Sequence, residues 1–425
     1  MHRIVHLSNC TRVVLVPHRD TAAATILVLY EVGSRYERHR VSGASHFIEH
    51  MMFKGTKRRP TTLSISRDLD AVGADYNAFT GKDYTGYYIR LQADKLPLAV
   101  DMLEDMLYHS NFSAKEINSE RKVIHEEIRM YDDNPAAAVD EILEEELYRG
   151  SPLGWKISGT VETMMGIGRA DLIAHRDAYY IPSRTVIAVA GRFDEESTLA
   201  MLEEKFGGIK EPGRKPRAYA PFRRAGQSAP LAAVRRKDTE QVQVSIGFPG
   251  FKYKDPQMPA ATLMSVILGG TMSSRLFTEV RERRGLAYTV RSSVSPYQDC
   301  GDVGIQAGLA KDRVHQAVAV IMRELKKIAA KKVSDGELTR AKENIKGRMS
   351  IDFEDSSRLA DWYGRQELLT AKIETPEDRI AMISAVSADD IRAVAEQVFN
   401  PKYMAIAVVG PFDDPAPFSA HAKIL

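Results

Sequence analysis

Two histidines and a glutamate fall within five residues, at His46, Glu49 and His50. On a helix, residues four apart share one face, so both imidazoles can direct a ring nitrogen at one ion, with the Glu49 carboxylate beside them. Neutral imidazoles are ligands that suit zinc. A carboxylate next to such an ion can take a proton from water and later pass it to a leaving group. The spacing therefore predicts a catalytic zinc site with Glu49 as general base.

A catalytic zinc site needs a third protein ligand, and the segment 114–130 can supply it. This segment has helical periodicity and many carboxylates, and Glu120 and Glu127 lie near its apolar edge. Glu126 falls on a more solvated face, so Glu127 is the favoured ligand. The alternative is that these acidic residues only solvate the helix. The order HxxEH is the reverse of the HExxH of thermolysin-like enzymes. The alternative for the motif taken alone is an ordinary polar helix face.

The elements that must hold these residues follow an α+β pattern. Strand-like runs over 12–16 and 25–32 come before helical patterns that begin at Ser45, Leu63 and Leu96. Glycine, proline and basic residues then accumulate over 207–230 without apolar periodicity, which is typical of a linker. The predicted organisation is a metal-binding domain over 1–212, a linker over 213–230 and a second domain over 231–425.

The order of elements begins again after the linker. The run 242–248 before Gly250 resembles the run 26–32 before Gly33, at an offset of 217 residues. The run 405–409 before Gly410 resembles 187–190 before Gly191, at an offset of 219 residues. The two offsets favour a duplicated domain, each copy a mostly antiparallel sheet packed with helices, over coincidence between short strands. The second copy contains no HxxEH, so only one copy would carry the chemistry.

Composition excludes several other classes of protein. The 59 basic and 57 acidic residues nearly balance, so a nucleic-acid partner is not expected. Two distant cysteines, Cys10 and Cys300, predict neither disulfides nor a cysteine metal site. No apolar run approaches the ~20 residues that cross a bilayer, and the first residues lack the pattern of a signal peptide. We therefore expect a cytoplasmic protein of bacterial type without membrane insertion.

Four motifs give the chain a specific resemblance. They are HFIEHMMFKGT from His46, NAFTGKDYTGYY from Asn77, ERKVIHEE from Glu120 and RERRGLAY from Arg281. In this order they resemble the pitrilysin/insulinase superfamily of inverzincin zinc peptidases, in the branch similar to the beta subunit of mitochondrial processing peptidase and its bacterial relatives. The resemblance implies an endopeptidase that cleaves peptides or unfolded segments with one Zn²⁺ per chain.

The resemblance also assigns roles to residues. It places the third ligand about 77 residues after the second histidine, which is Glu127 here, and gives Glu120 a supporting position. It makes the strand of Asn77, Ala78, Phe79 and Thr80 a sheet edge to which substrate adds as a further strand; a core hairpin without that role is the alternative. Arg281 and Tyr288 would hold the substrate backbone and the oxyanion, whereas a solvated helix end is the alternative.

Chains of this length resemble half of the clamshell enzymes in the family. The resemblance therefore implies a homodimer, or a heterodimer with a related subunit, in which Arg281 and Tyr288 of one chain complete the zinc site of the other. The rival interpretation is a non-catalytic or scaffold subunit, like the core subunits of respiratory complexes. Such relatives lose a ligand or the base, and here all four positions are filled.

Overall fold

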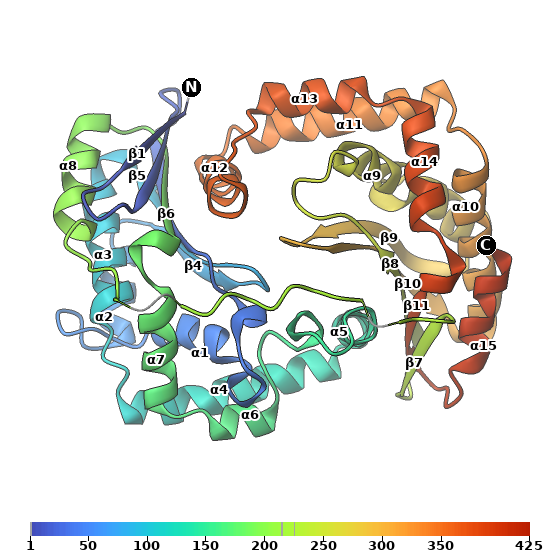
Figure 1. Ribbon diagram of the computed structural model, residues 1–425, viewed down its shortest axis with the longest axis horizontal. Helices are drawn as coiled ribbons and strands as arrows, with labels where there is room; N and C mark the ends of the chain where they lie inside the picture. Colours follow the sequence, from blue (N-terminus) through green and yellow to red (C-terminus); the bar gives the residue numbers. More distant parts are fainter. Residues whose placement is uncertain (1, 214–215, 225) are drawn as a thin grey trace. The chain divides into compact units, whose positions relative to one another are not determined.

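The structure is a computed structural model of the 425-residue chain, and it describes residues 2–213, 216–224 and 226–425. Two compact units interleave along the sequence, as the ribbon colours of Figure 1 illustrate. Unit 1 consists of the described residues of Met1–Ile128, Trp155–Ala220 and Arg348–Glu374. Unit 2 consists of the described residues of Arg129–Gly154, Pro221–Gly347 and Thr375–Leu425. Within the predicted linker 213–230, residues 214–215 and 225 lie outside the described residues.

The sheet of unit 1 has six strands in the order β1-β2-β6-β3-β5-β4. β2 pairs with β6 in parallel, and the other neighbours are antiparallel. The central strands are rich in Val, Ile, Leu and Ala because both of their faces are covered. The bounds are β1 Arg3–His6, β2 Arg12–Pro17, β3 Ala23–Tyr30, β4 Asp75–Thr80, β5 Thr85–Gln92 and β6 Thr185–Gly191.

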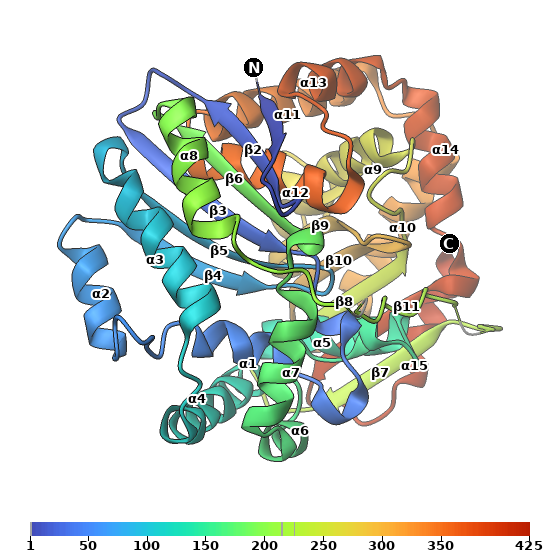
Figure 2. The ribbon, with the colours of Figure 1, turned by 60° about the vertical axis from the view of Figure 1, so that its left-hand side comes forward.

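Helices cover both faces of this sheet. Along β3, alternate side chains point to opposite faces: Ile26 and Val28 pack with helices of the first half of the chain, whereas Leu27 and Leu29 pack with α12. Figure 2 shows α3 and α8 side by side across the strands. The helices are α1 Ala44–Met51, α2 Thr62–Asp70, α3 Leu96–His109, α4 Ala114–Asp133, α6 Val161–Gly166, α7 Arg169–Tyr179, α8 Glu195–Phe206 and α12 Ser356–Thr370.

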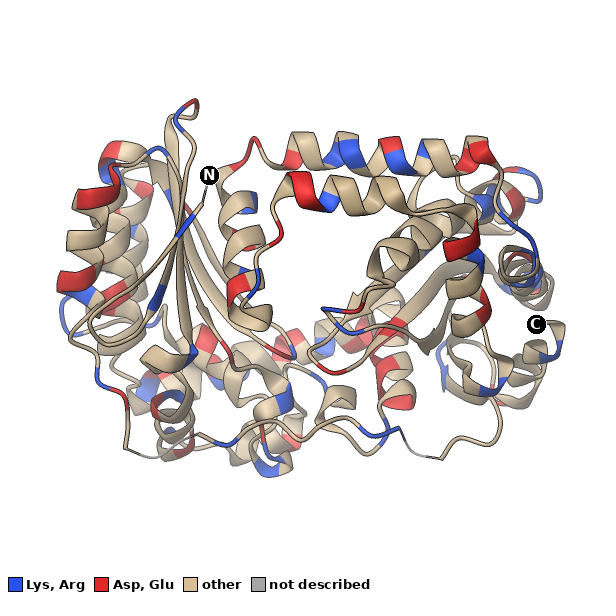
Figure 3. Cartoon of the chain, turned by 45° about the horizontal axis from the view of Figure 1, so that its top comes forward, with Lys and Arg blue, Asp and Glu red and all other residues tan. Residues whose placement is uncertain are grey.

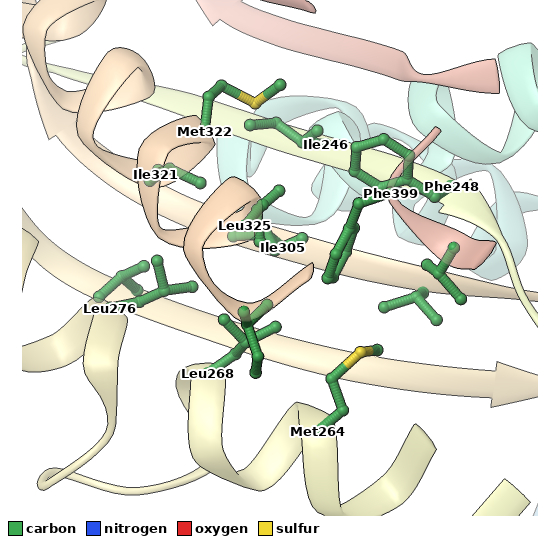
Figure 4. Close-up of a cluster of buried hydrophobic side chains, with 14 of the residues drawn as sticks. Ile246, Phe248, Met264, Leu268, Leu276, Ile305, Ile321, Met322, Leu325 and Phe399 are labelled. Atoms are coloured by element: carbon green, nitrogen blue, oxygen red, sulfur yellow. The ribbon is translucent and has the colours of Figure 1, made fainter. Parts of the chain in front are cut away.

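The sheet of unit 2 has five strands in the order β7-β11-β8-β10-β9. Figure 4 shows part of its core, in which Ile246 and Ile305 of the sheet pack near Leu325. The strands are β7 Leu231–Arg236, β8 Gln241–Pro249, β9 Ala287–Pro296, β10 Gly301–Ala310 and β11 Ala405–Gly410. The helices are α5 Pro135–Leu147, α9 Met258–Ser265, α10 Val314–Ala330, α11 Asp335–Asp352, α13 Pro376–Ala385, α14 Ala388–Val398 and α15 Ala416–Ser419, with π-helical turns at Val266–Gly270 and Phe277–Glu282.

The two sheets repeat one topology. Without β1, the order β2-β6-β3-β5-β4 corresponds strand by strand to β7-β11-β8-β10-β9, and in each sheet one parallel pair stands among antiparallel pairs. This agreement explains both sequence offsets, and the predicted α+β class is confirmed. Each repeat also gives one helix to the other unit: α5 packs on β8 and β11, and α12 packs on β3 and β6. The compact units exchange these helices, and the division at 213–230 stays a prediction.

Charged residues of both signs are interspersed along the helices (Figure 3), in keeping with the formal net charge of +2. No described helix combines the length and the apolar character that crossing a membrane requires.

Candidate metal centre

Helix α1 carries the paired histidines, and a buried carboxylate holds its first turn. Gly43 stands at the N-cap with φ of 95°, a left-handed conformation that favours glycine, and offers no side chain as a cap. Glu37 instead accepts hydrogen bonds from the backbone N–H groups of Gly43 and Ser45, both at 2.7 Å. Burial raises the pKa of Glu37 to about 7, although these bonds oppose the shift. Glu37 thus fixes where the helix begins.

The apolar face of α1 turns the histidines toward α4. Phe47, Ile48 and Met51 are buried in the core of unit 1. Because residues 46 and 50 are four apart, both histidines lie on the same side of the helix. Each is only partly exposed, with side-chain exposures of 12% for His46 and 20% for His50.

Three side chains from two helices converge on one point. His46 and His50 come from α1 and Glu127 comes from α4. The two Nε2 atoms are 3.3 Å apart, and carboxylate oxygens of Glu127 lie 3.7 Å from His46 Nε2 and 3.5 Å from His50 Nε2. Ligands at zinc distances in a tetrahedron stand about 3.3 Å from one another. The spacing therefore fits one zinc ion, and the structure brings together Glu127, not Glu126, with the histidines.

The protonation of the two rings also suits a metal. Burial, and then the neighbouring His50, lower the pKa of His46 to about 3, so its ring is neutral at pH 7. His50 Nδ1 lies 2.8 Å from Glu120 Oε1, which places the proton on Nδ1 and the lone pair on Nε2. Burial lowers the pKa of His50, but Glu120 raises it overall, so a cation would compete with a proton at Nε2. The Nε2 lone pairs of His46 and His50 can therefore both bind one cation.

Glu120 lies beneath His50 and makes a second charged contact. Its Oε2 atom is 2.6 Å from Lys54 Nζ, and its side chain is 5% exposed. Burial raises the pKa of Glu120, but the hydrogen bonds from His50 and Lys54 lower it overall, so the carboxylate stays ionised. The chain Lys54–Glu120–His50 therefore fixes the orientation and tautomer of one imidazole.

The loop after α1 holds Lys54 in place. Gly55 has φ of 109°, and a Cβ there would lie 2.4 Å from the carbonyl oxygen of Pro60. Thr56 Oγ1 donates to the buried carboxylate of Asp105 at 2.7 Å, and Arg59 donates to the same oxygen at 2.8 Å. These contacts tie the loop to α3.

Glu49 points from α1 toward the sheet, where Thr80 Oγ1 donates a hydrogen bond to its Oε2 atom at 2.5 Å. Burial raises the pKa of Glu49, and the Thr80 hydrogen bond works in the opposite direction. The structure thus places the predicted base beside the metal ligands and connects it to β4.

Strand β4, which carries Asn77 to Thr80, is the last strand of its sheet. The Gly81 N–H donates to the Tyr84 carbonyl at 2.8 Å, and hydrogen-bonded pairs alternate along an antiparallel ladder. The backbone N–H and C=O groups of Ala78 and Thr80 therefore face the open edge. In agreement, the Ala78 N–H is bonded at 2.8 Å to the side-chain oxygen of Asn77 and not to β5.

Arg281 and Tyr288 belong to unit 2, whereas His46, His50 and Glu127 belong to unit 1. The Arg281 guanidinium lies 5.5 Å from the centre of the Tyr288 ring and 4.7 Å from that of Phe277. Tyr288 is 69% exposed. The two predicted substrate residues thus lie together on the surface of unit 2.

Three contacts of the site were not predicted from the sequence. They are the capping of α1 by Glu37, the ion pair of Lys54 with Glu120, and the hydrogen bond from the Thr80 hydroxyl to Glu49. Lys54 lies in the loop after α1, beyond the end of the helix at Met51, so helical spacing gave no signal for its contact with Glu120. Glu37 and Thr80 carried no signal either, because their partners are set by tertiary folding.

Residues 12–161 match the insulinase domain of peptidase family M16, and residues 166–345 match the peptidase M16 inactive domain. The chain belongs to peptidase family M16. This result confirms the predicted family and the predicted class of enzyme, a zinc peptidase. The HxxEH motif lies in the insulinase match, and the inactive-domain match begins after it, at residue 166.

Relatives in the M16 family are similar over nearly the whole chain. An uncharacterized zinc protease of Streptomyces coelicolor is 35% identical over 416 residues, 97% of this chain and 90% of that protein. The uncharacterized zinc protease YmxG of Bacillus subtilis is 34% identical over 403 residues, 95% of this chain and 97% of that protein.

Solved structures share the fold. A protease from Helicobacter pylori aligns with a TM-score of 0.90 at 24% identity, over 97% of this chain and 99% of that one. A chain of complex III2 from Candida albicans aligns with a TM-score of 0.83 at 18% identity, over 99% of each chain.

Proposed function

We propose that this M16 protein is a zinc metalloendopeptidase that hydrolyses peptides or unfolded polypeptide segments, with zinc held by His46, His50 and Glu127. The observation that carries the proposal is the convergence of these three side chains at tetrahedral spacing. The Glu49 carboxylate is near enough for the charges of His50 and Glu127 to shift its pKa. One ion per chain fits this arrangement.

Bound zinc supplies Lewis-acid chemistry, which polarises a carbonyl oxygen and lowers the pKa of water. Glu49 accepts the proton of the attacking water and delivers it to the amine that leaves. In the metal-free chain burial raises the pKa of Glu49, while the Thr80 hydrogen bond lowers it. Glu120 holds the His50 ring, and Thr80 holds Glu49.

The substrate binds in extended form to the edge of β4. Ala78 and Thr80 direct their backbone N–H and C=O groups there, and a peptide would displace the Asn77 side-chain oxygen from the Ala78 N–H. The contacts to the peptide then involve its main chain and select little for sequence. A strand can add only if the substrate has an extended segment without its own hydrogen-bond partners. Unfolded chains meet this condition, whereas folded proteins do not.

Arg281 and Tyr288 supply electrophilic support to the substrate carbonyl, and they come from a second chain. We infer a homodimer, or a heterodimer with a related subunit, in which the zinc site of one chain meets this pair from the other. Mixing the Glu49→Gln and Arg281→Ala variants tests the arrangement, because a mixed dimer contains one intact composite site. Recovered cleavage supports it; full activity at monomer mass in gel filtration contradicts it.

The alternative is a non-catalytic subunit, and likeness of fold to a complex III chain permits it. The presence of the base and of all three ligand positions favours the enzyme. A chelator test separates the two functions. Removing the metal should abolish cleavage of an unfolded casein-like substrate, one equivalent of Zn²⁺ per chain should restore it, and a subunit without catalysis would cleave nothing in either state.

A further inference from the structure

Thr80 takes part in two arrangements, the open edge of the sheet and the hydrogen bond to Glu49. We propose that Thr80 is a positioning residue, which holds the general base in one orientation beside the edge of β4 where a peptide adds. This inference rests on the proposed function and extends it to a residue whose side chain does not bind the metal.

The alternation of the strand separates the two roles of Thr80. Tyr76 and Ala78 pack with the core that contains α1, whereas Phe79 packs with the core that contains α12. The Thr80 side chain lies on the first of these faces, where it meets Glu49. Its backbone N–H and C=O lie in the plane of the sheet and face the open edge. One residue therefore contacts both the base and the place where a peptide adds.

The end of β4 is held firmly, so Thr80 is a fixed point. The backbone N–H of Ser34 donates to the Gly81 carbonyl at 3.1 Å, and the N–H of Arg35 donates to the Lys82 carbonyl at 3.1 Å. The Lys82 Nζ donates to the Trp155 carbonyl at 2.6 Å. The backbone at this turn cannot move without breaking these bonds, so the Thr80 side chain starts from a fixed position.

The hydrogen bond also gives the two oxygens of Glu49 different roles: one holds the carboxylate in place and the other can accept a proton. Thr80 donates to Oε2 and leaves the other oxygen, Oε1, for the proton. Holding one oxygen lets the carboxylate stay in a single orientation while the other oxygen accepts the proton. A misoriented carboxylate would lower the rate of proton transfer without changing the metal ligands or the peptide edge.

A double-mutant cycle on the metal-free chain tests the contact without reference to activity. Thr80→Val should raise the unfolding equilibrium constant about tenfold when Glu49 is present, since a hydrogen bond to a charged group is lost. In a Glu49→Ala background the same change should have less than about a twofold effect. Equal effects in the two backgrounds would overturn the contact.

Kinetics test the positioning role. Thr80→Val should lower kcat by about 10-fold to 100-fold with KM and zinc content within about twofold, as expected for loss of a group that orients a catalytic residue. Thr80→Ser, which keeps the hydroxyl, should stay within about threefold of the wild type in kcat.

The matched control is Thr85→Val on the neighbouring strand. Thr85 pairs with Thr80, and its buried hydroxyl donates to the Val32 carbonyl at 2.8 Å and not to Glu49. This variant should lose stability and keep kcat. An equal fall in kcat for both valine variants, or a loss that appears in KM or zinc content, would overturn the inference. A wild type that holds zinc and cleaves no peptide would instead refute the proposed function.

Discussion

Lys54 Nζ lies 2.6 Å from Glu120 Oε2, and the other oxygen of the same carboxylate lies 2.8 Å from His50 Nδ1. The ammonium group thus acts on the metal site through one intermediate. It keeps Glu120 ionised in a buried position, and the ionised carboxylate keeps the His50 proton on Nδ1.

Replacing Lys54 with Met should weaken zinc binding about tenfold, the lower end of what loss of a supporting contact costs in metal sites. Competition with a chromogenic chelator measures this affinity. Lys57→Met is the matched control, because Lys57 is exposed and lies in the same loop. Equal zinc affinity in Lys54→Met and the wild type would show that the ammonium group does not support the site.

Glu37 should make the stability of the metal-free chain depend on pH. Its folded pKa of about 7 lies above the ordinary value of 4.5. A carboxyl with a raised pKa stabilises the folded state fully below about pH 4.5, and this contribution is lost as the pH rises to about 7. The free energy of unfolding of the wild type relative to Glu37→Gln should therefore fall by about 3 kcal/mol between pH 4.5 and pH 8. Urea titrations check this, and a difference independent of pH would contradict it.

The packing of α12 on the sheet of unit 1 can be tested at Gly364. A Cβ at this position would lie 3.0 Å from side-chain carbons of Leu29 and Ala188 in the sheet of unit 1. Gly364→Leu should lower the free energy of unfolding by about 1–3 kcal/mol, the cost of overpacking. Gly347→Leu in α11 is the control, since nothing lies within 4 Å of its Cβ position. Equal stability of the two variants would contradict the packing of α12 on this sheet.

The open edge of β4 predicts a selective effect of proline at position 78. The Ala78 N–H faces the edge, where it is bonded to the Asn77 side-chain oxygen. Ala78→Pro removes this donor, which the peptide would use in place of Asn77, and leaves the ladder to β5 complete. KM should rise at least about tenfold with zinc content unchanged, and Ala78→Gly, which keeps the N–H, should behave like the wild type. Normal KM in the proline variant would exclude this edge as the site of peptide addition.

Much of the site was predictable because its signals are local. His46, Glu49 and His50 lie within one helical segment, and the stripe that favours Glu127 is a property of one helix. The topology was partly predictable for a similar reason: the repeated strand runs recur at nearly the same offset, 217 and 219 residues, and end at glycines. The sheet topology confirmed the predicted α+β class, and the match to the insulinase domain confirmed the predicted peptidase family.

The remaining features depend on long-range contacts. The exchange of α5 and α12 between the repeats could not be predicted from local sequence, because the apolar face of a helix does not determine which of two sheets it packs on. The partners of Glu37 and Thr80 are likewise set by loops that approach one another only in the folded chain. The roles of Arg281 and Tyr288 stay a prediction from the family resemblance.

We propose that Glu49 acts as the base of a zinc peptidase, and the Glu49→Gln variant tests this role most directly. The measurement compares zinc content and cleavage of a fluorogenic peptide in the wild type and the variant. Because Gln keeps the shape of the side chain and cannot accept a proton, we expect full zinc content and at least a 10²-fold loss of kcat. Unchanged cleavage by the variant, or a wild type that binds no zinc, would contradict the account.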